Sequence, residues 1–435
     1  MRKCCSKTLF TFFLILSLFL LPSPVFAQSN SGTESSSGDS LVIKLAVIGP
    51  GDELYFWWGH IGIIIEDYET NRSRFYDWGV FSFENTNFFS NFAMGRLIYS
   101  CAVSAPTWNL RNYIETNRDI TIYTMDLPAD KKEEVRDFAE WSVLPENKDY
   151  FYHHFKDNCA TRVRDIFDRA TDGAFKARYG DAPGRYTLRQ HVRRHTWFSP
   201  FFDWFLNFLM GRNIDQSMTV WEEMFLPAEI GARALEFSYT GSDGIERKLV
   251  SSVEKLNTAV NRPQVLDVPR LQWPRELVFG CALAVVLGAL LFFKNRENRI
   301  ASIIWVGMQG ILGLFFGISG LVLFFMTFFT NHDYTYYNIN ILYINPLLIG
   351  AVVFGILHIT ASDDLEKYKW DRAIKAVWSY VLVFGSITTL LRLIPGLYQM
   401  NLVTLAMVLP FAAVLGFLPD LLVYIRREYL WRWFN

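Results

Sequence analysis

The sequence lacks an excess of charge of either sign, and it is poor in cysteine. Lys and Arg number 42 against 43 Asp and Glu, which gives a formal net charge of −1. Nucleic-acid binding usually needs a basic excess, so the composition gives no support for such a partner. No Cys/His spacing resembles a zinc site, and glycine-rich phosphate motifs and the Gly-x-Ser-x-Gly motif are absent. We therefore expect neither a metal nor a cofactor.

The N-terminus has the pattern of a secretory signal. Arg2, Lys3 and Lys7 precede the apolar stretch 8–21, and Val25-Phe26-Ala27 places small residues at the cleavage positions. We predict a signal peptide over residues 1–27, with an uncleaved membrane anchor as the alternative. The polar segment 28–40 is typical of a flexible linker.

Residues 41–263 are predicted to form one α+β domain on the outer side of the membrane. Apolar runs predict strands at 41–48, 60–66, 74–80, 97–103 and 120–125, and the pair 60–66 and 74–80 is a candidate hairpin. A helix is predicted over 129–143, followed by one that begins near Cys159. The aromatic-rich stretch 197–227 predicts either a core helix or a helix lying on the bilayer surface.

Residues 274–435 are predicted to form an all-α membrane domain. Apolar segments suggest five transmembrane helices, each long enough for a hydrocarbon core of about 30 Å. Basic residues follow the first, third and fifth segments, so these ends are expected in the cytoplasm and the 41–263 domain outside it. The protein is thus expected to be a multi-pass inner-membrane protein with a periplasmic N-terminal domain and a cytoplasmic C-terminus. The five segments are 275–293, 302–328, 341–360, 375–394 and 400–424.

Cys159 is the candidate nucleophile. Asp157 or Asn158 can cap the helix that follows, which places Cys159 in its first turn, where the helix dipole favours a thiolate. Three cysteines follow the predicted signal peptide. Cys281 lies in a membrane segment, whereas Cys101 and Cys159 could form a structural disulfide in an oxidising compartment, which is the alternative interpretation.

His60 is the candidate base. It begins an apolar strand between Gly59 and Gly62, two glycines that would leave room for a substrate near the ring. Asp77 would lie beside His60 if the two hairpin strands pair, and its carboxylate would orient the imidazole. A buried structural histidine and a strand-end aspartate are the alternatives. Of the adjacent His153 and His154, at most one can face the site.

Polar residues cluster in the outer loops of the membrane domain. His332, Asn338 and Asn340 are the main members, with further amide side chains near residue 400. They could bind lipid head groups beneath the periplasmic domain. Alternatively, they cap helix ends at the membrane interface.

With these segments identified, the chain resembles the Lnb-type lipoprotein N-acyltransferases. The segments that carry the resemblance are Trp58-Gly59-His60, Phe75-Tyr76-Asp77-Trp78-Gly79, Asp157-Asn158-Cys159-Ala160-Thr161-Arg162-Val163-Arg164-Asp165, Trp221-Glu222-Glu223-Met224-Phe225-Leu226-Pro227, and His332 with Asn338-x-Asn340 and Asn345-Pro346-Leu347.

The resemblance implies a thiol-dependent periplasmic domain fused to a membrane domain, and an acyl chain moved from a phospholipid to the N-terminal amine of a diacylglyceryl lipoprotein. Histidine before cysteine in the chain is the order of a circularly permuted papain-like fold. By motif match, Cys159 is the nucleophile and His60 the base, while the family more often has asparagine at the position of Asp77. Trp58, Asn158, His332, Asn338 and Asn340 are predicted to contact substrate. An envelope cysteine peptidase or amidase with the same Cys-His pair, and a non-catalytic membrane scaffold, are the alternatives.

Overall fold

The computed structural model describes residues 37–81 and 87–425. The predicted signal peptide, most of the linker and the last basic cluster lie outside these residues. Residues 37–40, expected to belong to the linker, instead form the short helix η1 (Ser37–Ser40), whose Gly38 amide donates to the Glu133 carboxylate at 2.6 Å. Regular structure is therefore present a few residues before the predicted domain start.

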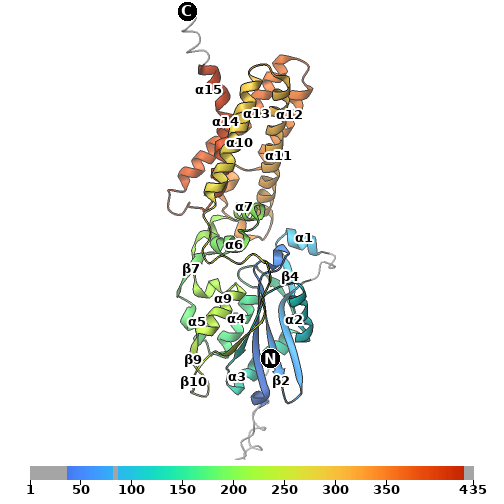
Figure 1. Ribbon diagram of the computed structural model, residues 1–435, viewed down its shortest axis with the longest axis vertical. Coiled ribbons are helices and arrows are strands. Elements are labelled where there is room, and N and C mark those ends of the chain that lie inside the picture. The colour runs from blue at the N-terminus through green and yellow to red at the C-terminus, as the bar shows by residue number, and fades with distance from the viewer. Residues whose placement is uncertain (1–36, 82–86, 426–435) are drawn as a thin grey trace, which may run out of the picture. The chain divides into compact units, whose positions relative to one another are not determined.

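One antiparallel sheet organises the first part of the chain (Figure 1). Among the described residues it has seven strands, in the order β11-β5-β1-β2-β3-β4-β6. The predicted strands and the hairpin are confirmed, with small changes at their ends. The strands are β1 (Leu41–Ile48), β2 (His60–Asp67), β3 (Arg72–Val80), β4 (Leu97–Ser104), β5 (Ile120–Met125), β6 (Asp149–Tyr152) and β11 (Val250–Asn257).

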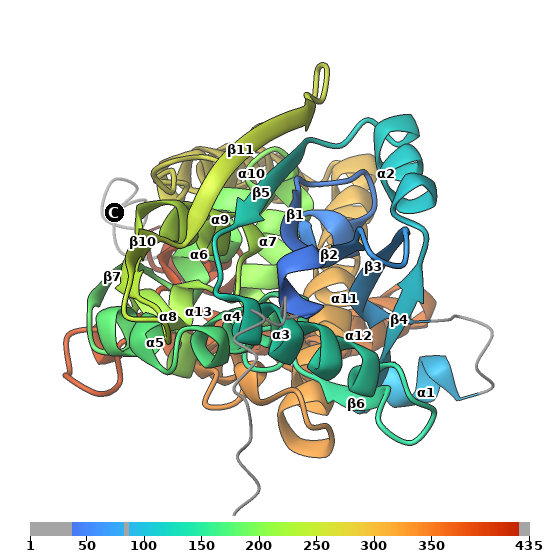
Figure 2. The same cartoon turned by 90° about the horizontal axis from the view of Figure 1, so that it is seen from below.

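Alternating side chains along these strands build a core on each face of the sheet. On one face, Ile43, Leu45 and Ile63 belong to the buried cluster that includes side chains of α3, α4 and α9. The opposite face, with Ile48 and Phe75, packs against α2 (Figure 2). The helices of this part are α1 (Phe88–Ala93), α2 (Pro106–Glu115), α3 (Ala129–Ser142), α4 (Cys159–Ala170), α5 (Ala174–Tyr179), α6 (Leu188–Thr196), α7 (Pro200–Leu209), α8 (Val220–Glu223) and α9 (Pro227–Glu236).

Short elements connect the longer ones. Two small antiparallel sheets pair β7 (Pro183–Thr187) with β8 (Ser217–Thr219), and β9 (Ser238–Thr240) with β10 (Glu246–Lys248). The remaining 3₁₀ helices are η2 (Leu54–Phe56), η3 (Arg212–Asp215), η4 (Asp333–Thr335), η5 (Ile339–Leu342) and η6 (Pro346–Ile349).

The second part of the chain is helical, but the five predicted spans differ in regularity. Among the described residues, three helices are long and apolar enough to cross a membrane: α10 (Trp273–Lys294), α11 (Arg299–Phe329) and α13 (Asp364–Leu391). The third predicted span is not one continuous helix, because Asn345 and Pro346 divide it into η5, η6 and α12 (Gly350–Thr360). The fifth is also divided, into α14 (Leu402–Gly416) and α15 (Leu418–Ile425).

The aromatic-rich stretch contributes a core helix. Trp204 and Phe208 of α7 are buried in the same cluster as the long apolar helices, and the Trp204 ring lies 5.4 Å from that of Phe315 in α11. Phe201, about one turn before Trp204 on α7, is half exposed. The core interpretation is therefore confirmed for one face of α7, and this face connects the first part of the chain to the apolar helices.

Candidate active site

Asn158 fixes where the helix that carries Cys159 begins. Its side-chain oxygen accepts a hydrogen bond from the Thr161 amide at 2.9 Å, and the Thr161 hydroxyl accepts one from the Asn158 amide at 2.8 Å. This reciprocal capping box makes Cys159 the first residue of α4. Asp157, the alternative cap, instead pairs with Arg162 at 2.7 Å. The sulfur thus belongs to the first turn, where the helix dipole stabilises negative charge.

The pairing of β2 with β3 brings His60 and Asp77 together. Ile63 pairs with Tyr76 and Ile64 with Phe75, so His60 and Asp77 point to the same face of the sheet. The Nε2 atom of His60 donates to Oδ1 of Asp77 at 2.7 Å. Only 15% and 14% of the two side chains are exposed. A carboxylate in this position holds the imidazole in one orientation.

Gly79 is the place where His60 and Cys159 meet. The pairing of β3 with β4 is irregular between Trp78 and Val80, and Gly79 there has a φ of +116°. A Cβ atom built on Gly79 would lie 3.5 Å from Cβ of Cys159 and 3.7 Å from Cε1 of His60. Because glycine has no side chain, the Cys159 and His60 side chains flank the same free space.

The surroundings of His60 favour a charged imidazole. Burial lowers the pKa of His60, but the charges of Asp77, Tyr113 and Cys159 and the hydrogen bond to Asp77 outweigh it and raise that pKa well above its usual value. Among the described residues, Nδ1 of His60 has no hydrogen-bond partner, so this nitrogen is available for proton exchange. A positive imidazole beside the sulfur stabilises a thiolate.

Tyr99, Tyr150 and Tyr152 lie around Cys159 and form an aromatic wall of the site. The Tyr99 and Tyr152 rings stack at 4.0 Å, and Tyr150 lies in the same buried cluster as Cys159. Burial raises the pKa of Tyr99 to about 12, and the charge of Cys159 adds to this effect. These phenols stay neutral at physiological pH, so the wall is aromatic and uncharged, which suits an apolar substrate group better than a charged one.

Two family models match this chain. The Lnb N-terminal periplasmic domain matches residues 27–194, and the Lnb transmembrane domain, defined as five-helical, matches residues 272–418. The chain belongs to the Lnb family. Cys159, His60 and Asp77 fall in the first match. No curated protein and no solved structure matches the chain.

The Lnb-type protein is therefore a membrane protein with an N-terminal periplasmic domain and a helical transmembrane domain. The mixed α and β content and the antiparallel sheet agree with the fold class expected from the sequence. The permuted papain-like topology stays a prediction.

Asn158, predicted to contact substrate, uses its side chain for hydrogen bonds within the Lnb-type protein. Its Nδ2 atom donates to the carbonyls of His154 and Phe225, both at 2.9 Å. Phe225 belongs to the segment 221–227 that carries the family resemblance, and the buried Glu223 there accepts a hydrogen bond from His191 at 2.9 Å. This segment therefore supports the start of α4, and substrate contact by Asn158 stays a prediction.

Trp58, also predicted to contact substrate, lies beside helix α6. Its ring is 6.4 Å from that of His195 and stacks on it. The indole Nε1 atom is buried and has no hydrogen-bond partner among the described residues. A contact between Trp58 and substrate stays a prediction.

The polar residues of the membrane loops form a buried network with α7. The Asn338 and Asn340 amides both donate to the Phe208 carbonyl, at 2.8 and 2.9 Å. Gln399 donates to Asn338 and Asn401 to Asn340, each at 3.0 Å. All five residues are buried. The geometry favours the interpretation that Asn338 and Asn340 cap a helix end, because their hydrogen-bonding groups are used within the protein, and binding of head groups stays a prediction.

His332 joins the membrane loops to α1. Its Nε2 atom donates to the Phe92 carbonyl at 3.0 Å, and its Nδ1 atom accepts from the Tyr334 hydroxyl at 2.8 Å. Burial lowers the pKa of His332, which agrees with this neutral tautomer. Its predicted contact with substrate stays a prediction.

His153 and His154 lie in different surroundings. His153 forms a hydrogen bond with Asp333 at 2.9 Å, and Lys156 forms an ion pair with the same carboxylate at 2.5 Å. The ring of His154 lies 5.4 Å from that of Tyr152, in the aromatic wall, and burial lowers the pKa of His154 to about 4. Only His154 therefore faces the wall that lines the site.

The disulfide alternative is wrong, because Cys101 and Cys159 are both free thiols. Cys101 lies on β4, opposite Trp78 of β3. Cys281, the third free thiol, is exposed on α10.

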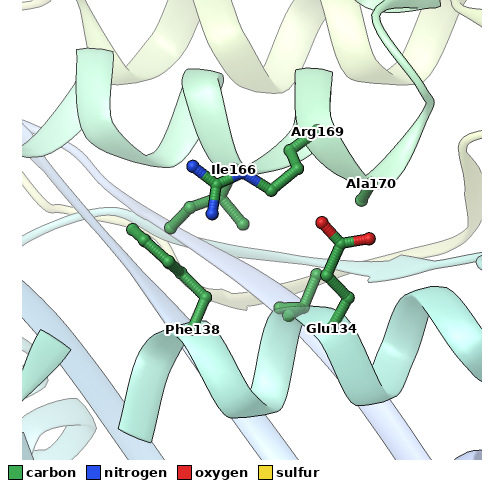
Figure 3. A pocket seen from close by; sticks show the side chains of 6 residues that line it. Glu134, Phe138, Ile166, Arg169 and Ala170 are labelled. Carbon is green, nitrogen blue, oxygen red and sulfur yellow. The ribbon is translucent and has the colours of Figure 1, made fainter. Parts of the chain in front are cut away.

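A small cavity elsewhere in the domain does not belong to this site (Figure 3). It lies between α3 and α4 and has a volume of about 10 Å³, at most room for one water molecule. Phe138, Ile166 and Arg169 are among its lining residues. Ile166 and Arg169 are about two and three turns along α4 from Cys159, so the cavity is remote from the sulfur.

The sequence contains only partial signals for the remaining site residues. Gly79 ends one of the segments that carry the resemblance, but its place between Cys159 and His60 depends on the irregular pairing of β3. Gly62 has a different role from the expected one, because the Phe75 ring fills the space beside it. Tyr99 and Tyr113 reach the site from β4 and α2, and no local pattern identifies them.

Proposed function

We propose that this Lnb-type protein is a thiol-dependent acyltransferase that moves an acyl chain from a phospholipid to the N-terminal amine of a diacylglyceryl lipoprotein. The observation that supports it most strongly is that Cys159, at the start of α4, and the His60–Asp77 pair flank the same free space at Gly79.

In the first half of the proposed reaction, His60 takes the Cys159 proton and the sulfur attacks the ester carbonyl of the phospholipid. The backbone amide of Cys159 has no partner within the helix, because it lies in the first turn, and with a neighbouring donor it stabilises the oxyanion. The carbon–oxygen bond then breaks, and His60 returns its proton to the departing lysophospholipid oxygen. The acyl chain remains on Cys159 as a thioester.

In the second half, the amine of the lipoprotein attacks the thioester carbonyl. The carbon–sulfur bond breaks, an amide forms, and the amine proton passes to His60 and restores the starting pair. The membrane domain supports this proposal physically, because lifting an acyl chain into water costs about 0.8 kcal/mol per methylene. A nucleophile held at the bilayer surface avoids that cost. The proposed location is the inner membrane, with the C-terminus in the cytoplasm.

The deciding experiment traps the thioester. Purified protein in vesicles is incubated with phospholipid, and the peptide that contains Cys159 is analysed by mass spectrometry, with Cys159→Ser as the control. We expect an acyl adduct on the wild type that disappears when a diacylglyceryl peptide with a free amine is added and reappears as the amide product. Release of free fatty acid, with no amide formed, would instead support a hydrolase. An unreactive Cys159 would support a scaffold.

A further inference from the structure

Helix α1 is tied to the outer end of a transmembrane helix. The Asn331 amide donates to the Met94 carbonyl at 2.9 Å, just after α1, and His332 donates to the Phe92 carbonyl at 3.0 Å. Helix α11 ends at Phe329, only two residues before Asn331. Helix α1 is therefore held next to the last turn of α11, whose Phe328 and Phe329 are 61% and 58% exposed.

Phenylalanines dominate the exposed side of α1. Phe89 is 71% exposed and Phe92 is 47% exposed. The helix, Phe-Phe-Ser-Asn-Phe-Ala, carries no charged residue. Uncharged aromatic surface next to the end of a membrane-spanning helix is typical of segments that contact the bilayer interface, and the exposed phenylalanines at the end of α11 lie nearby.

A series of aromatic rings leads from α1 to the candidate active site. The Phe92 and Phe88 rings are 6.1 Å apart, and the Phe88 and Phe81 rings are 5.7 Å apart. Phe81 lies 5.0 Å from Tyr99, which stacks on Tyr152 at 4.0 Å. Tyr99 and Tyr152 form the wall around Cys159. The rings are thus neighbours at every step from the exposed side of α1 to Tyr152.

We propose that Phe89 and Phe92 insert into the outer leaflet and that Phe88, Phe81, Tyr99 and Tyr152 guide one acyl chain of a phospholipid from the bilayer to Cys159. The part of this inference that brings an acyl chain to Cys159 rests on the proposed acyl transfer. The contact of α1 with lipid rests only on its place beside α11 and on its exposed phenylalanines. A lipid surface fits these observations better than a protein partner, because the patch lies near exposed phenylalanines at the end of a helix that is long and apolar enough to cross a membrane.

The first experiment tests the lipid contact without using activity. Benzoylphenylalanine is placed at position 89, and at position 245 as the matched control, since Ile245 is 57% exposed between β9 and β10. The full-length protein in phosphatidylethanolamine and phosphatidylglycerol vesicles is irradiated, and the modified peptides are identified by mass spectrometry. We expect phospholipid adducts at position 89 and none at position 245. Cross-links from position 89 to a second copy of the protein, or no lipid adduct there, would overturn the proposal.

The second experiment tests delivery of the acyl chain. The rate of acyl transfer to Cys159 is measured with phospholipid in vesicles and with a water-soluble short-chain ester. For Phe89→Asp we expect the ratio of the phospholipid rate to the soluble-ester rate to fall at least about tenfold, because a carboxylate resists insertion into the leaflet. Ile245→Asp should leave both rates unchanged. An unchanged ratio in Phe89→Asp would contradict the guiding role. A wild-type Cys159 that reacts with neither ester would instead refute the proposed acyl transfer, and the cross-linking result would still decide the lipid contact.

Discussion

The Nε2 atom of His60 lies 2.7 Å from Oδ1 of Asp77, across the pair of strands β2 and β3. This contact leaves Nδ1 as the nitrogen that can exchange a proton with Cys159. It also places a negative charge behind the imidazole, which favours its charged form in a nearly buried position. The carboxylate is therefore bound at one nitrogen of the ring and the other nitrogen is left for the sulfur, which is the arrangement that a thiol nucleophile needs.

Replacing Asp77 should change the pH dependence of thioester formation. Burial lowers the pKa of His60. Among the effects that raise this pKa, the charge of Asp77 is the largest. Asp77→Asn removes that charge, so the pKa of His60 falls and the imidazole loses its proton at a lower pH. The alkaline limb of the rate, where the protonated imidazole is lost, should move to lower pH. Single-turnover thioester formation measured from about pH 5 to pH 10 checks this, and an unmoved alkaline limb would refute the role of Asp77.

Gly79→Ala should obstruct the space beside the sulfur and the imidazole. The new Cβ would lie 3.5 Å from Cβ of Cys159 and 3.7 Å from Cε1 of His60, in the space that the reacting groups share. At these ordinary van der Waals distances the methyl group fits without moving either side chain, but it occupies the space that a substrate carbonyl needs. Misplacing a substrate by about 1 Å can cost a hundredfold in rate, so we expect thioester formation to slow at least about tenfold. Gly244→Ala is the control, since Gly244 also has a positive φ, of +76°, but no atom lies within 4 Å of its Cβ position. It carries the backbone strain of about 1–3 kcal/mol and should keep its activity.

The sequence contains enough information for five of the seven strands of the main sheet, for the helix that begins at Cys159 and for the pairing of His60 with Asp77, whereas β6 and β11 were not predicted. Those features depend on the alternation of apolar and polar residues along a strand and on a residue that caps a helix. Both patterns can be recognised in a single sequence. The position of Gly79 between two side chains could not be predicted, because it depends on the irregular pairing of β3 with β4. The divided third span was also missed, since hydropathy measures apolar length and does not register the break at Asn345 and Pro346.

The thiols should differ in reactivity. Burial raises the pKa of the Cys101 thiol to about 12, so at about pH 7.5 it remains protonated and unreactive. Cys159 lies at the start of α4 near the imidazole of His60, which can take its proton. We expect iodoacetamide to alkylate Cys159 at least about tenfold faster than Cys101 in the native protein, and His60→Ala to remove most of this difference. Peptide mass spectrometry quantifies each cysteine separately. Equal rates at Cys101 and Cys159 would argue against an activated nucleophile.

The asparagines of the membrane loops should matter for stability more than for binding. The Asn338 and Asn340 amides donate to the same carbonyl, that of Phe208 at the end of α7. Asn340→Ala leaves buried partners of Asn340, among them the Asn401 amide, without a hydrogen bond, which costs about 1–3 kcal/mol for each such group. Thermal unfolding in detergent should show a lower midpoint. The control Asn147→Ala, in the turn between α3 and β6, removes only a solvent-exposed hydrogen bond and should leave the midpoint nearly unchanged.

The same variant separates the two interpretations of these loops. If Asn340 only holds the Phe208 carbonyl, the KM for phospholipid should stay within about twofold of the wild-type value at a temperature where Asn340→Ala is folded. If Asn340 binds a lipid head group, its loss should raise KM by about the tenfold that corresponds to one hydrogen bond to a charged group, without a matching fall in the unfolding midpoint. The buried position of Asn340, with no exposed surface, favours the first result.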